Sequence, residues 1–431
     1  MKRAVVVGTG AGGATAAKEL QGNYDVTVLE AGREFVPFTT ETARLETLKK
    51  TGLLLSEKLV PLLFPAMKIL KTEENMVLVR AAGFGGTTTI STGNALRMDR
   101  HLRDIGIDLD EEFAEIYREI PVSTDHQGKW HRITRRLFEV CRGLNLDPQP
   151  TPKMVDFNKC TRCGRCIFGC RQDARWDSRR FLKIALEKGV HLVAGWKAQR
   201  VVLRDGRAIG VDSSAGLRRR FVPADLVVLA AGGFSTPVIL QNSGISCEPS
   251  LFVDPVLCVA AEVRGAGQDK EMQMPFVAQQ DQFILSPYFD FLSFFFNRQW
   301  AFPASDTVSL MVKLADSSTG SVTRRGVDKP LTDKDKDGLQ RGVALCREIL
   351  KGIGVPEEKM VLGTINAGHP GGTLPLTRDE STNLHHKRLP ENVYVADSTL
   401  LPYSLGNPVI LTIIALAKRV SRICNRNISE F

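Results

Sequence analysis

Residues 3–30 read RAVVVGTGAGGATAAKELQGNYDVTVLE, and they are the strongest indication of the fold in the sequence. Residues 3–8 are apolar and rich in β-branched side chains, which predicts a buried strand of a parallel sheet. An Ala-rich helical pattern follows as far as Leu20, and residues 25–30 predict a second strand. Between the first strand and the helix stands a Gly-x-Gly-x-x-Gly sequence, made of Gly8, Gly10 and Gly13. Together these elements predict a βαβ unit with a dinucleotide site at its glycine loop.

Each residue type in this unit serves the binding of a dinucleotide. Gly8 permits the tight turn, Gly10 lets the backbone approach a pyrophosphate, and Gly13 lets the helix pack on the strand. Glu30 ends the second strand at the spacing where a carboxylate accepts a hydrogen bond from a ribose hydroxyl. The sequence VLEAG at 28–32 is more typical of FAD-binding than of NAD-binding chains. We therefore expect an FAD-binding α/β domain built on a doubly wound parallel sheet.

A second glycine-rich loop lies at residues 83–89 (GFGGTTT). Small residues at Gly85 and Gly86 allow the backbone to pass close to a flat ligand, and the Thr87 hydroxyl supplies a hydrogen bond. We expect these three residues to bind the cofactor. The alternative is that the loop is only a tight turn.

The remaining chain divides by composition. Residues 225–230 (DLVVLA) predict another buried strand, whereas 249–359 has shorter alternating runs and more aromatic residues, which predicts an α+β substrate domain. We predict a discontinuous FAD-binding domain at 1–100, 191–248 and 360–431, a helical and cysteine-rich segment at 101–190, and the substrate domain at 249–359.

The composition is that of an ordinary globular chain. The chain has 431 residues, of which 43% are hydrophobic and 24% charged, and this composition excludes a disordered or fibrous protein. The net charge of +9 would suit an acidic partner, but no nucleic-acid-binding motif accompanies it, so we expect no nucleic acid partner. The longest apolar stretches, such as 408–417, fall short of the ~18 residues that a membrane-spanning helix needs. We expect a cytoplasmic protein without a transmembrane segment, and a peripheral membrane contact stays open.

Four of the nine cysteines stand within eleven residues. Their spacing, Cys-x2-Cys-x2-Cys-x3-Cys, is that of the bacterial ferredoxin residues that hold a [4Fe–4S] cluster: Cys160, Cys163, Cys166 and Cys170. Arg171 stands where such runs carry Pro, and no second run exists to share ligands. The fourth ligand is therefore either Cys170 or a remote thiol, Cys258 or Cys247. We predict an iron–sulfur segment; a structural zinc ion and a motif without metal are the alternatives.

An iron–sulfur cluster beside a flavin indicates that electrons leave singly, to a protein carrier. The residues around the cysteines are mostly basic: Lys159, Arg162, Arg165, Arg171, Arg175, Arg179 and Arg180. They predict a docking surface for an acidic, ferredoxin-like carrier or a partner redox subunit. The alternative is a solvated basic face.

With these features the chain resembles the glucose–methanol–choline (GMC) oxidoreductases, an FAD-dependent family. The most specific match is residues 232–244 (GGFSTPVILQNSG), which follow the family's second signature. The sequences GHPGGT (368–373), ENVYVADSTLLP (391–402) and SLGNP (404–408) are similar to the cholesterol-oxidase-like branch, whose active site pairs a His with an Asn. The resemblance implies FAD contacts at Gly232, Asp397, Asn407 and Pro408.

His369 and Asn407 are the catalytic residues that the resemblance implies. Oxidising an alcohol requires a base for the hydroxyl proton, and the unperturbed pKa of His, about 6.5, suits that role. Asn407 can donate to the substrate oxygen and fix its position. A closing helix that starts at Pro408 would point N–H groups at the flavin and stabilise negative charge there.

These features predict an FAD-dependent oxidoreductase that acts on the CH–OH group of a small apolar alcohol. The electrons would pass through the [4Fe–4S] cluster to a protein acceptor, or the enzyme would run in reverse as a reductase of a carbonyl. The rival hypothesis is a non-catalytic electron-transfer subunit of a larger redox complex.

Nine aromatic residues stand between positions 283 and 302, although aromatic residues make up only 7% of the chain. Buried strands over the core would explain this density. An apolar wall at the substrate entrance would explain it too and would favour a hydrophobic substrate. A contact with a partner subunit or a membrane is the third alternative.

Overall fold

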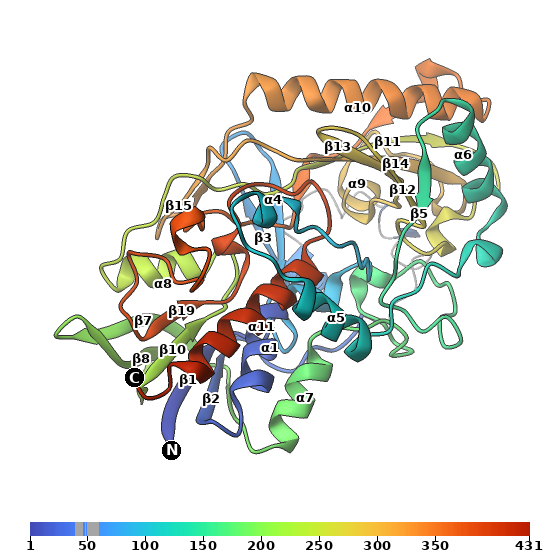
Figure 1. The fold of residues 1–431 in the computed structure, drawn as a ribbon. Coiled ribbons are helices and arrows are strands. Elements are labelled where there is room, and N and C mark those ends of the chain that lie inside the picture. Colours follow the sequence, from blue (N-terminus) through green and yellow to red (C-terminus); the bar gives the residue numbers. More distant parts are fainter. Residues whose placement is uncertain (39–45, 48, 50–59) are drawn as a thin grey trace.

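The computed structural model describes residues 1–38, 46–47, 49 and 60–431, and two large β-sheets organise them (Figure 1). The first sheet has five parallel strands in the order β19-β10-β1-β2-β6. These strands are β1 (Lys2–Val7), β2 (Tyr24–Glu30), β6 (His191–Ala194), β10 (Leu226–Leu229) and β19 (Val393–Val395). The predicted α/β fold with a parallel sheet is confirmed.

Helices pack on one face of this sheet. Helix α1 (Ala11–Leu20) connects β1 to β2, and its side chains at Ala14, Ala16 and Ala17 are fully buried. Because alanine side chains are short, α7 (Arg179–Glu187) and α11 (Ile410–Arg426) can pack closely against α1 (Figure 1). Helix α11 begins at Ile410 rather than at Pro408 as predicted, because Val409 is its N-terminal cap and Pro408 lies in the preceding turn.

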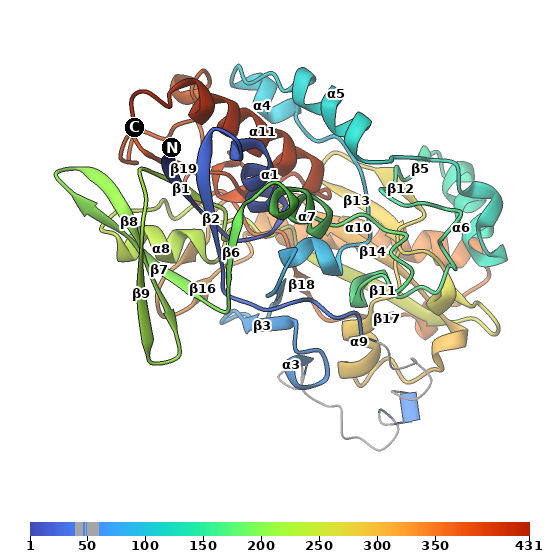
Figure 2. The same ribbon diagram turned by 90° about the horizontal axis from the view of Figure 1, so that it is seen from below.

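A second, antiparallel sheet packs on the same parallel strands. It consists of β7 (Lys197–Arg204), β8 (Arg207–Ala215) and β9 (Arg218–Pro223), which contact β2, β10 and β1 respectively (Figure 2). The chain between β6 and β10 forms these strands and no helix. Within the described residues this face of the parallel sheet is therefore covered by strands, while the strand order runs outward from β1 in both directions, as a doubly wound sheet requires.

The other large sheet has nine strands along the path β3-β4-β18-β11-β14-β13-β12-β5, with β17 paired to β11. They are β3 (Met67–Lys71), β4 (Val77–Ala81), β5 (Pro148–Pro150), β11 (Val256–Glu262), β12 (Phe276–Gln279), β13 (Phe283–Pro287), β14 (Thr307–Leu314), β17 (Val361–Leu362) and β18 (Asn366–Ala367). Helix α10 (Asp333–Gly352) packs on β11, β13 and β14, and α6 (Arg132–Gly143) packs beside α10 (Figure 1).

This sheet collects strands from all three predicted parts of the chain. Strands β3, β4 and β18 come from the ranges predicted for the FAD-binding domain, and β5 comes from the cysteine-rich range. The predicted domain boundaries remain a prediction. The shorter elements are α3 (Val60–Leu63), α4 (Arg100–Asp104), α5 (Asp110–Glu119), α8 (Thr236–Asn242), α9 (Phe291–Phe296), β15 (Ser321–Val322) and β16 (Val327–Asp328).

The aromatic stretch is part strand and part helix. Strand β13 is followed by α9, and the Asp290 side chain caps this helix by accepting a hydrogen bond from the Leu292 N–H at 3.1 Å. A run of apolar residues without alternation does not distinguish a buried strand from a buried helix. Here the Asp290 cap marks the start of a helix.

Among the helices that the structure describes, none is both long and apolar enough to cross a membrane.

Candidate active site

A cavity of about 1260 Å³ lies where the carboxyl ends of β1 and β2 face strands β4, β11 and β14 of the nine-stranded sheet. Ligands of parallel α/β sheets bind beyond the carboxyl ends of the strands, so the cavity is at the expected edge. Most of the predicted site residues line it: Gly8, Gly10, Glu30, Gly86, Thr87, Gly232, His369, Asp397 and Pro408. Gly13, Gly85 and Asn407 are not among its lining residues.

The first glycine loop has two kinds of glycine. A Cβ added to Gly10 would meet no atom within 4 Å, so this residue faces the open cavity. A Cβ on Gly12 would lie 1.6 Å from the Ala396 carbonyl oxygen, and one on Gly13 would lie 2.0 Å from that of Gly8. Gly12 and Gly13 therefore serve packing, while Gly10 keeps space free in front of the α1 N-terminus, which has no side-chain cap.

Glu30 crosslinks this loop from the end of β2. Its carboxylate accepts hydrogen bonds from the Thr9 N–H at 3.0 Å, the Thr9 hydroxyl at 2.7 Å and the Gly32 N–H at 2.8 Å. The side chain lines the cavity while it holds the loop in place. The sequence analysis missed Thr9, because nothing in the glycine pattern itself points to its hydroxyl.

The second glycine loop packs directly against the first. A Cβ on Gly86 would lie 3.0 Å from the Gly10 Cα, so the second loop needs a small residue at Gly86. Gly85 and Gly86 have φ values of +91° and +51°, which favour glycine, and the short 3₁₀ helix from Gly86 to Ile90 follows. Thr87 lines the cavity, and the Gly85 carbonyl accepts hydrogen bonds from the hydroxyls of Thr88 and Ser178.

Asp397 ties the C-terminal strand to the second signature. Its Oδ2 accepts hydrogen bonds from the Gly232 N–H at 2.8 Å and the Thr236 hydroxyl at 2.6 Å. Burial raises the pKa of this carboxyl, and these hydrogen bonds offset part of the rise. The contact brings Gly232 and Asp397, which are 165 residues apart, to the same wall of the cavity.

His369 faces the cavity with 29% of its side chain exposed. Its Nδ1 lies 3.4 Å from Oδ2 of Asp254, and the Lys313 ammonium donates to the same oxygen at 2.5 Å. Burial and the Lys313 charge lower the pKa of His369, and Asp254 offsets part of that effect. The imidazole is therefore neutral at neutral pH and able to accept a proton.

Asp254 and Lys313 were missed by the sequence analysis, although each stands out in its surroundings. Lys313 is the charged residue in the run TVSLMVKL (307–314), and Asp254 interrupts SLFVDPV (250–256). A charge within an otherwise buried strand is costly unless it is paired, so such positions are candidates for a functional site.

Asn407 does not reach the cavity wall in this structure. Its Nδ2 donates to the Gln279 side chain and to the Leu405 carbonyl, both at 3.2 Å, and the residue is 1% exposed. Its Oδ1 is buried and has no hydrogen-bond partner among the described residues. Asn407 is thus not among the residues that line the cavity with His369, and its role stays a prediction.

The aromatic stretch supplies the apolar wall of the cavity. Tyr288, Phe291, Phe295 and Phe296 line it, together with Met311. Phe289 and Phe294 are fully buried and belong to the core cluster behind that wall. One segment thus supplies residues both of the core and of the cavity wall.

The four cysteines lie near one another beside the cavity. Burial raises the pKa of Cys160, and the neighbouring thiols of Cys163 and Cys170 act in the same direction. Burial also raises the pKa of Cys166, although Arg175 and Lys153 beside it oppose the rise. Among the described residues, however, no three Cys, His, Asp or Glu side chains converge as ligands of a metal ion. The predicted metal site has no support from this geometry.

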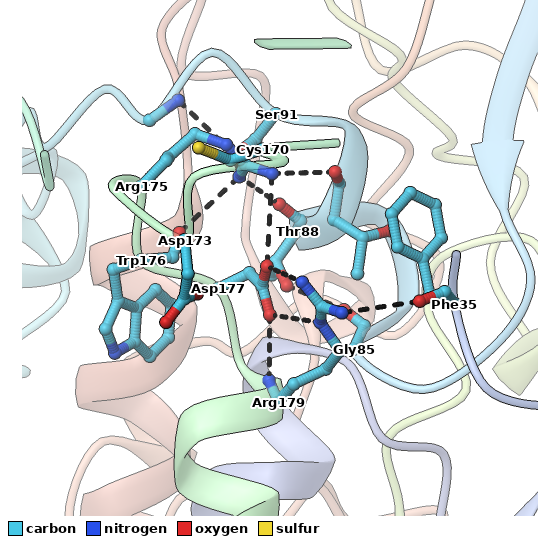
Figure 3. Close-up of polar contacts among 12 residues, drawn as sticks. Phe35, Gly85, Thr88, Ser91, Cys170, Asp173, Arg175, Trp176, Asp177 and Arg179 are labelled. Atoms are coloured by element: carbon cyan, nitrogen blue, oxygen red, sulfur yellow. Dashed lines mark hydrogen bonds and ion pairs between the residues drawn. The ribbon is translucent and has the colours of Figure 1, made fainter. Parts of the chain in front are cut away.

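Hydrogen bonds tie the chain that follows Cys170 to the second glycine loop (Figure 3). The buried Arg175 guanidinium donates to the carbonyls of Thr88 and Thr89 and to the Ser91 hydroxyl, at 2.5 to 2.7 Å. Arg179 is held by Asp177 at 2.8 Å. The prediction that Arg175 belongs to a docking surface is therefore wrong. The exposed members of the basic set are Lys159, Arg162 and Arg171.

Comparisons with known proteins agree with this geometry. A family model described as GMC oxidoreductase matches residues 3–256, more than half of the chain. An uncharacterised protein of Methanocaldococcus jannaschii is 26% identical over 423 residues, which cover 97% of this chain and 98% of that protein. A long-chain-alcohol oxidase of Arabidopsis thaliana is 27% identical over 271 residues, or 56% of this chain, and this chain spans only 34% of that protein.

A solved structure extends the likeness to the whole fold. Pyridoxine 4-oxidase from Mesorbium loti superposes with a TM-score of 0.71 at 16% identity, covering 98% of this chain and 99% of that one. At that identity the superposition shows a shared fold. With the family match over residues 3–256, it follows that the chain belongs to the GMC oxidoreductases, a family of FAD-dependent enzymes.

Proposed function

We propose that this protein oxidises the CH–OH group of a small apolar alcohol, or reduces the corresponding carbonyl in reverse, with FAD as its cofactor. One observation carries the proposal: a single cavity runs from the Gly10 loop to His369. A nucleotide end and a proton acceptor thus share one cavity. The position of His369 at the cavity supports a likeness to the cholesterol-oxidase-like branch, whose active site pairs a His with an Asn. The position of Asn407 does not support it.

The residues present fit FAD. Gly10 leaves open space in front of the α1 N-terminus, where unpaired N–H groups and the helix dipole favour a pyrophosphate. Glu30, Gly86, Thr87, Gly232 and Asp397 line the walls along which the rest of the cofactor would lie. When bound, FAD would supply the acceptor for a hydride from the alcohol carbon.

His369 is the residue that would move the proton. Its Nδ1 is turned to Asp254, so Nε2 is the nitrogen left for the substrate hydroxyl. Because the pKa of the ring is lowered by burial and by Lys313, it starts as the neutral base that alcohol oxidation requires. In the reverse direction the protonated ring would donate the proton to the carbonyl oxygen.

The cavity wall favours an apolar substrate. Phe291, Phe295, Phe296 and Met311 present hydrocarbon surface to the same cavity that His369 and Lys313 line. A ligand with a hydroxyl at one end and an apolar body would satisfy both sides. The name of the Arabidopsis relative, a long-chain-alcohol oxidase, is consistent with this class of substrate.

Two neighbouring aromatic residues offer a test of this wall. Phe294→Ala should lower the free energy of unfolding by about 3–5 kcal/mol, since Phe294 is fully buried in the core and does not line the cavity. Phe296→Ala should cost less stability and raise KM for apolar alcohols, because Phe296 lines the cavity. Urea unfolding and steady-state kinetics on both variants measure the two effects. An unchanged KM for Phe296→Ala would show that the wall does not contact the substrate.

We further propose that Cys160, Cys163, Cys166 and Cys170 hold a [4Fe–4S] cluster. A cubane binds each thiolate at a different iron atom, so its ligands stand further apart than those of a single ion and need not converge on one point. The remote candidates have other neighbours: Cys258 lies beside Asp290 and Cys346, and Cys247 beside Arg388 and Glu248. This supports Cys170 as the fourth ligand and speaks against a single zinc ion.

Two buried cationic side chains beside the cysteines support the proposal that an anionic group binds there. Arg175 and Lys153 are 2% and 1% exposed and lie beside the Cys166 thiol. Burial lowers the pKa of Lys153 to about 7, and the neighbouring Cys166 and Cys160 oppose that fall. Ile167 and Phe168 continue the same segment into the cavity wall. When bound, the cluster would exchange single electrons, and the exposed Lys159, Arg162 and Arg171 would face an acidic carrier.

Anaerobically purified protein tests the cluster. We expect about four iron atoms and one FAD per chain, with cluster absorbance added to the flavin bands. Cys163→Ser should lose iron and keep FAD, whereas Cys258→Ser should keep both. A pure flavin spectrum with no iron would contradict the cluster and leave the flavin chemistry standing.

The rival function is a non-catalytic electron-transfer subunit. It would need no base, so the neutral His369 in the cavity speaks against it. An assay of alcohols with an artificial electron acceptor separates the two functions, because only an enzyme reduces the acceptor at the expense of an alcohol.

A further inference from the structure

Lys313 stands on the cavity side of a strand that is otherwise apolar or small. All eight residues of β14 are buried. Side chains alternate along a strand, and here Met311 and Lys313 line the cavity while Leu310, Val312 and Leu314 belong to the core cluster on the other side. The strand thus presents one ammonium group to the cavity, beside His369.

One carboxylate joins Lys313 to His369. Oδ2 of Asp254 accepts from the Lys313 ammonium at 2.5 Å and lies 3.4 Å from Nδ1 of His369. Oδ1 of Asp254 accepts from the Ser404 hydroxyl and, at 3.3 Å, from the Gly406 N–H. Asp254 therefore fixes a strand lysine, the proposed base and the loop that leads to Asn407.

The backbone at Asp254 is held in an uncommon conformation. Its φ is +53°, and Pro255 follows it. Left-handed backbone is unfavourable for a residue with a Cβ, and a following proline restricts the conformation further. Such strain persists where surrounding contacts over-determine it, and it is concentrated at functional sites.

A second buried ion pair nearby shows what a purely structural lysine looks like. The Lys329 ammonium has three acceptors: Asp316 at 2.9 Å, the Ser317 carbonyl at 2.6 Å and the Thr319 hydroxyl at 3.4 Å. All three of its N–H donors are used, and Lys329 does not line the cavity. Among the described residues Asp254 is the one acceptor of Lys313, which leaves two of its N–H donors for a ligand.

We propose that Lys313 is a further catalytic residue, which binds the substrate oxygen beside His369, and that Asp254 is the positioning residue that holds both side chains. The inference rests on the CH–OH chemistry of the proposed function. In that reaction the O–H bond breaks and its proton goes to Nε2 of His369. The C–H bond breaks and its electron pair leaves as hydride to FAD, while the C=O bond forms. Lys313 stabilises the negative charge that develops on the oxygen.

The charges around His369 give the proposal a second, independent readout. Asp254 and the Lys313 ammonium act on the ring in opposite directions, and burial lowers its pKa. Arg80 on β4 and Asp290, whose pKa burial raises to about 6, also line the cavity. Asp316 and Lys329 neutralise each other behind the wall. Removing Lys313 should therefore raise the pKa of His369, and removing the Asp254 charge should lower it.

The kinetic test compares two buried lysines. Lys313→Met should slow flavin reduction by the best alcohol about 10²–10³-fold, the loss typical of one donor to a developing oxyanion, with FAD retained. Lys329→Met, the matched control, loses a buried ion pair of the same kind and should keep the rate of the chemical step. Lys313→Arg, which keeps the charge, should recover part of the rate. Equal losses in Lys313→Met and Lys329→Met would overturn the proposal.

The second test needs no substrate. The pKa of His369 is followed by ¹⁵N NMR of the holoenzyme, with His369→Ala assigning the signal. We expect a higher pKa in Lys313→Met and a lower one in Asp254→Asn. The double variant, which leaves no unpaired charge, keeps the test available if a single variant does not fold. If the pKa of His369 shifts but no alcohol reduces the flavin, the proposed function fails while the coupling of His369, Asp254 and Lys313 stands. If the pKa is unshifted in every folded variant, that coupling is overturned.

Discussion

Replacing Gly10 by valine is expected to give a folded protein that contains no FAD. The φ of Gly10 is −66°, which any residue adopts, and an added Cβ would meet no protein atom within 4 Å. The side chain would instead occupy the space in front of the α1 N-terminus, where a pyrophosphate would bind. FAD content after purification and the far-UV circular dichroism spectrum measure the two halves of this expectation.

Gly12 provides the contrast within the same loop. A Cβ there would lie 1.6 Å from the Ala396 carbonyl oxygen, so Gly12→Ala should impair folding itself. A Gly10→Val protein that still carries one FAD per chain would show that the cofactor does not pass this loop.

Replacing His369 by alanine is expected to lower kcat about 10²–10⁴-fold while FAD stays bound, the usual contribution of a general base. His369 lines the cavity, and its ring contacts Asp254, which is not among the residues proposed to bind FAD. The activity of the unsubstituted enzyme should rise with pH through the lowered pKa of His369, because only the neutral ring accepts a proton.

Asn407→Ala is the informative companion variant. Because Asn407 bonds Gln279 and Leu405 and does not line the cavity, its loss should have a smaller effect than that of His369. A His369→Ala variant with unchanged kcat on a confirmed substrate would place the base elsewhere.

Local sequence patterns predicted the βαβ unit at the proposed nucleotide end of the site well. The glycine loop, α1 and Glu30 lie within thirty residues, and their spacing reflects one βαβ unit whose geometry is set by neighbours along the chain. The strands β7–β9 were not recognised as a covering sheet, because which element covers a face depends on tertiary packing rather than on local pattern.

The proposed catalytic end was harder to predict for the same reason. Asp254, Lys313 and His369 are brought together by β11, β14 and the turn after β18, and no periodicity links residues so far apart. Asn407 shows the converse: the family motif was present, but the side chain is taken up by Gln279. The buried position of Arg175 was equally invisible, since a basic residue in a basic run gives no sign of pointing inward.

The most direct test of the account is an anaerobic single-turnover experiment. The holoenzyme is mixed with a series of apolar primary and secondary alcohols without any acceptor, and the flavin absorbance is followed. The account predicts that at least one alcohol reduces the flavin and that His369→Ala slows this step at least about 10²-fold. Dithionite serves as the control that the flavin can be reduced. If no alcohol reduces the flavin and no matching carbonyl reoxidises the reduced flavin, the protein is not an enzyme of CH–OH groups.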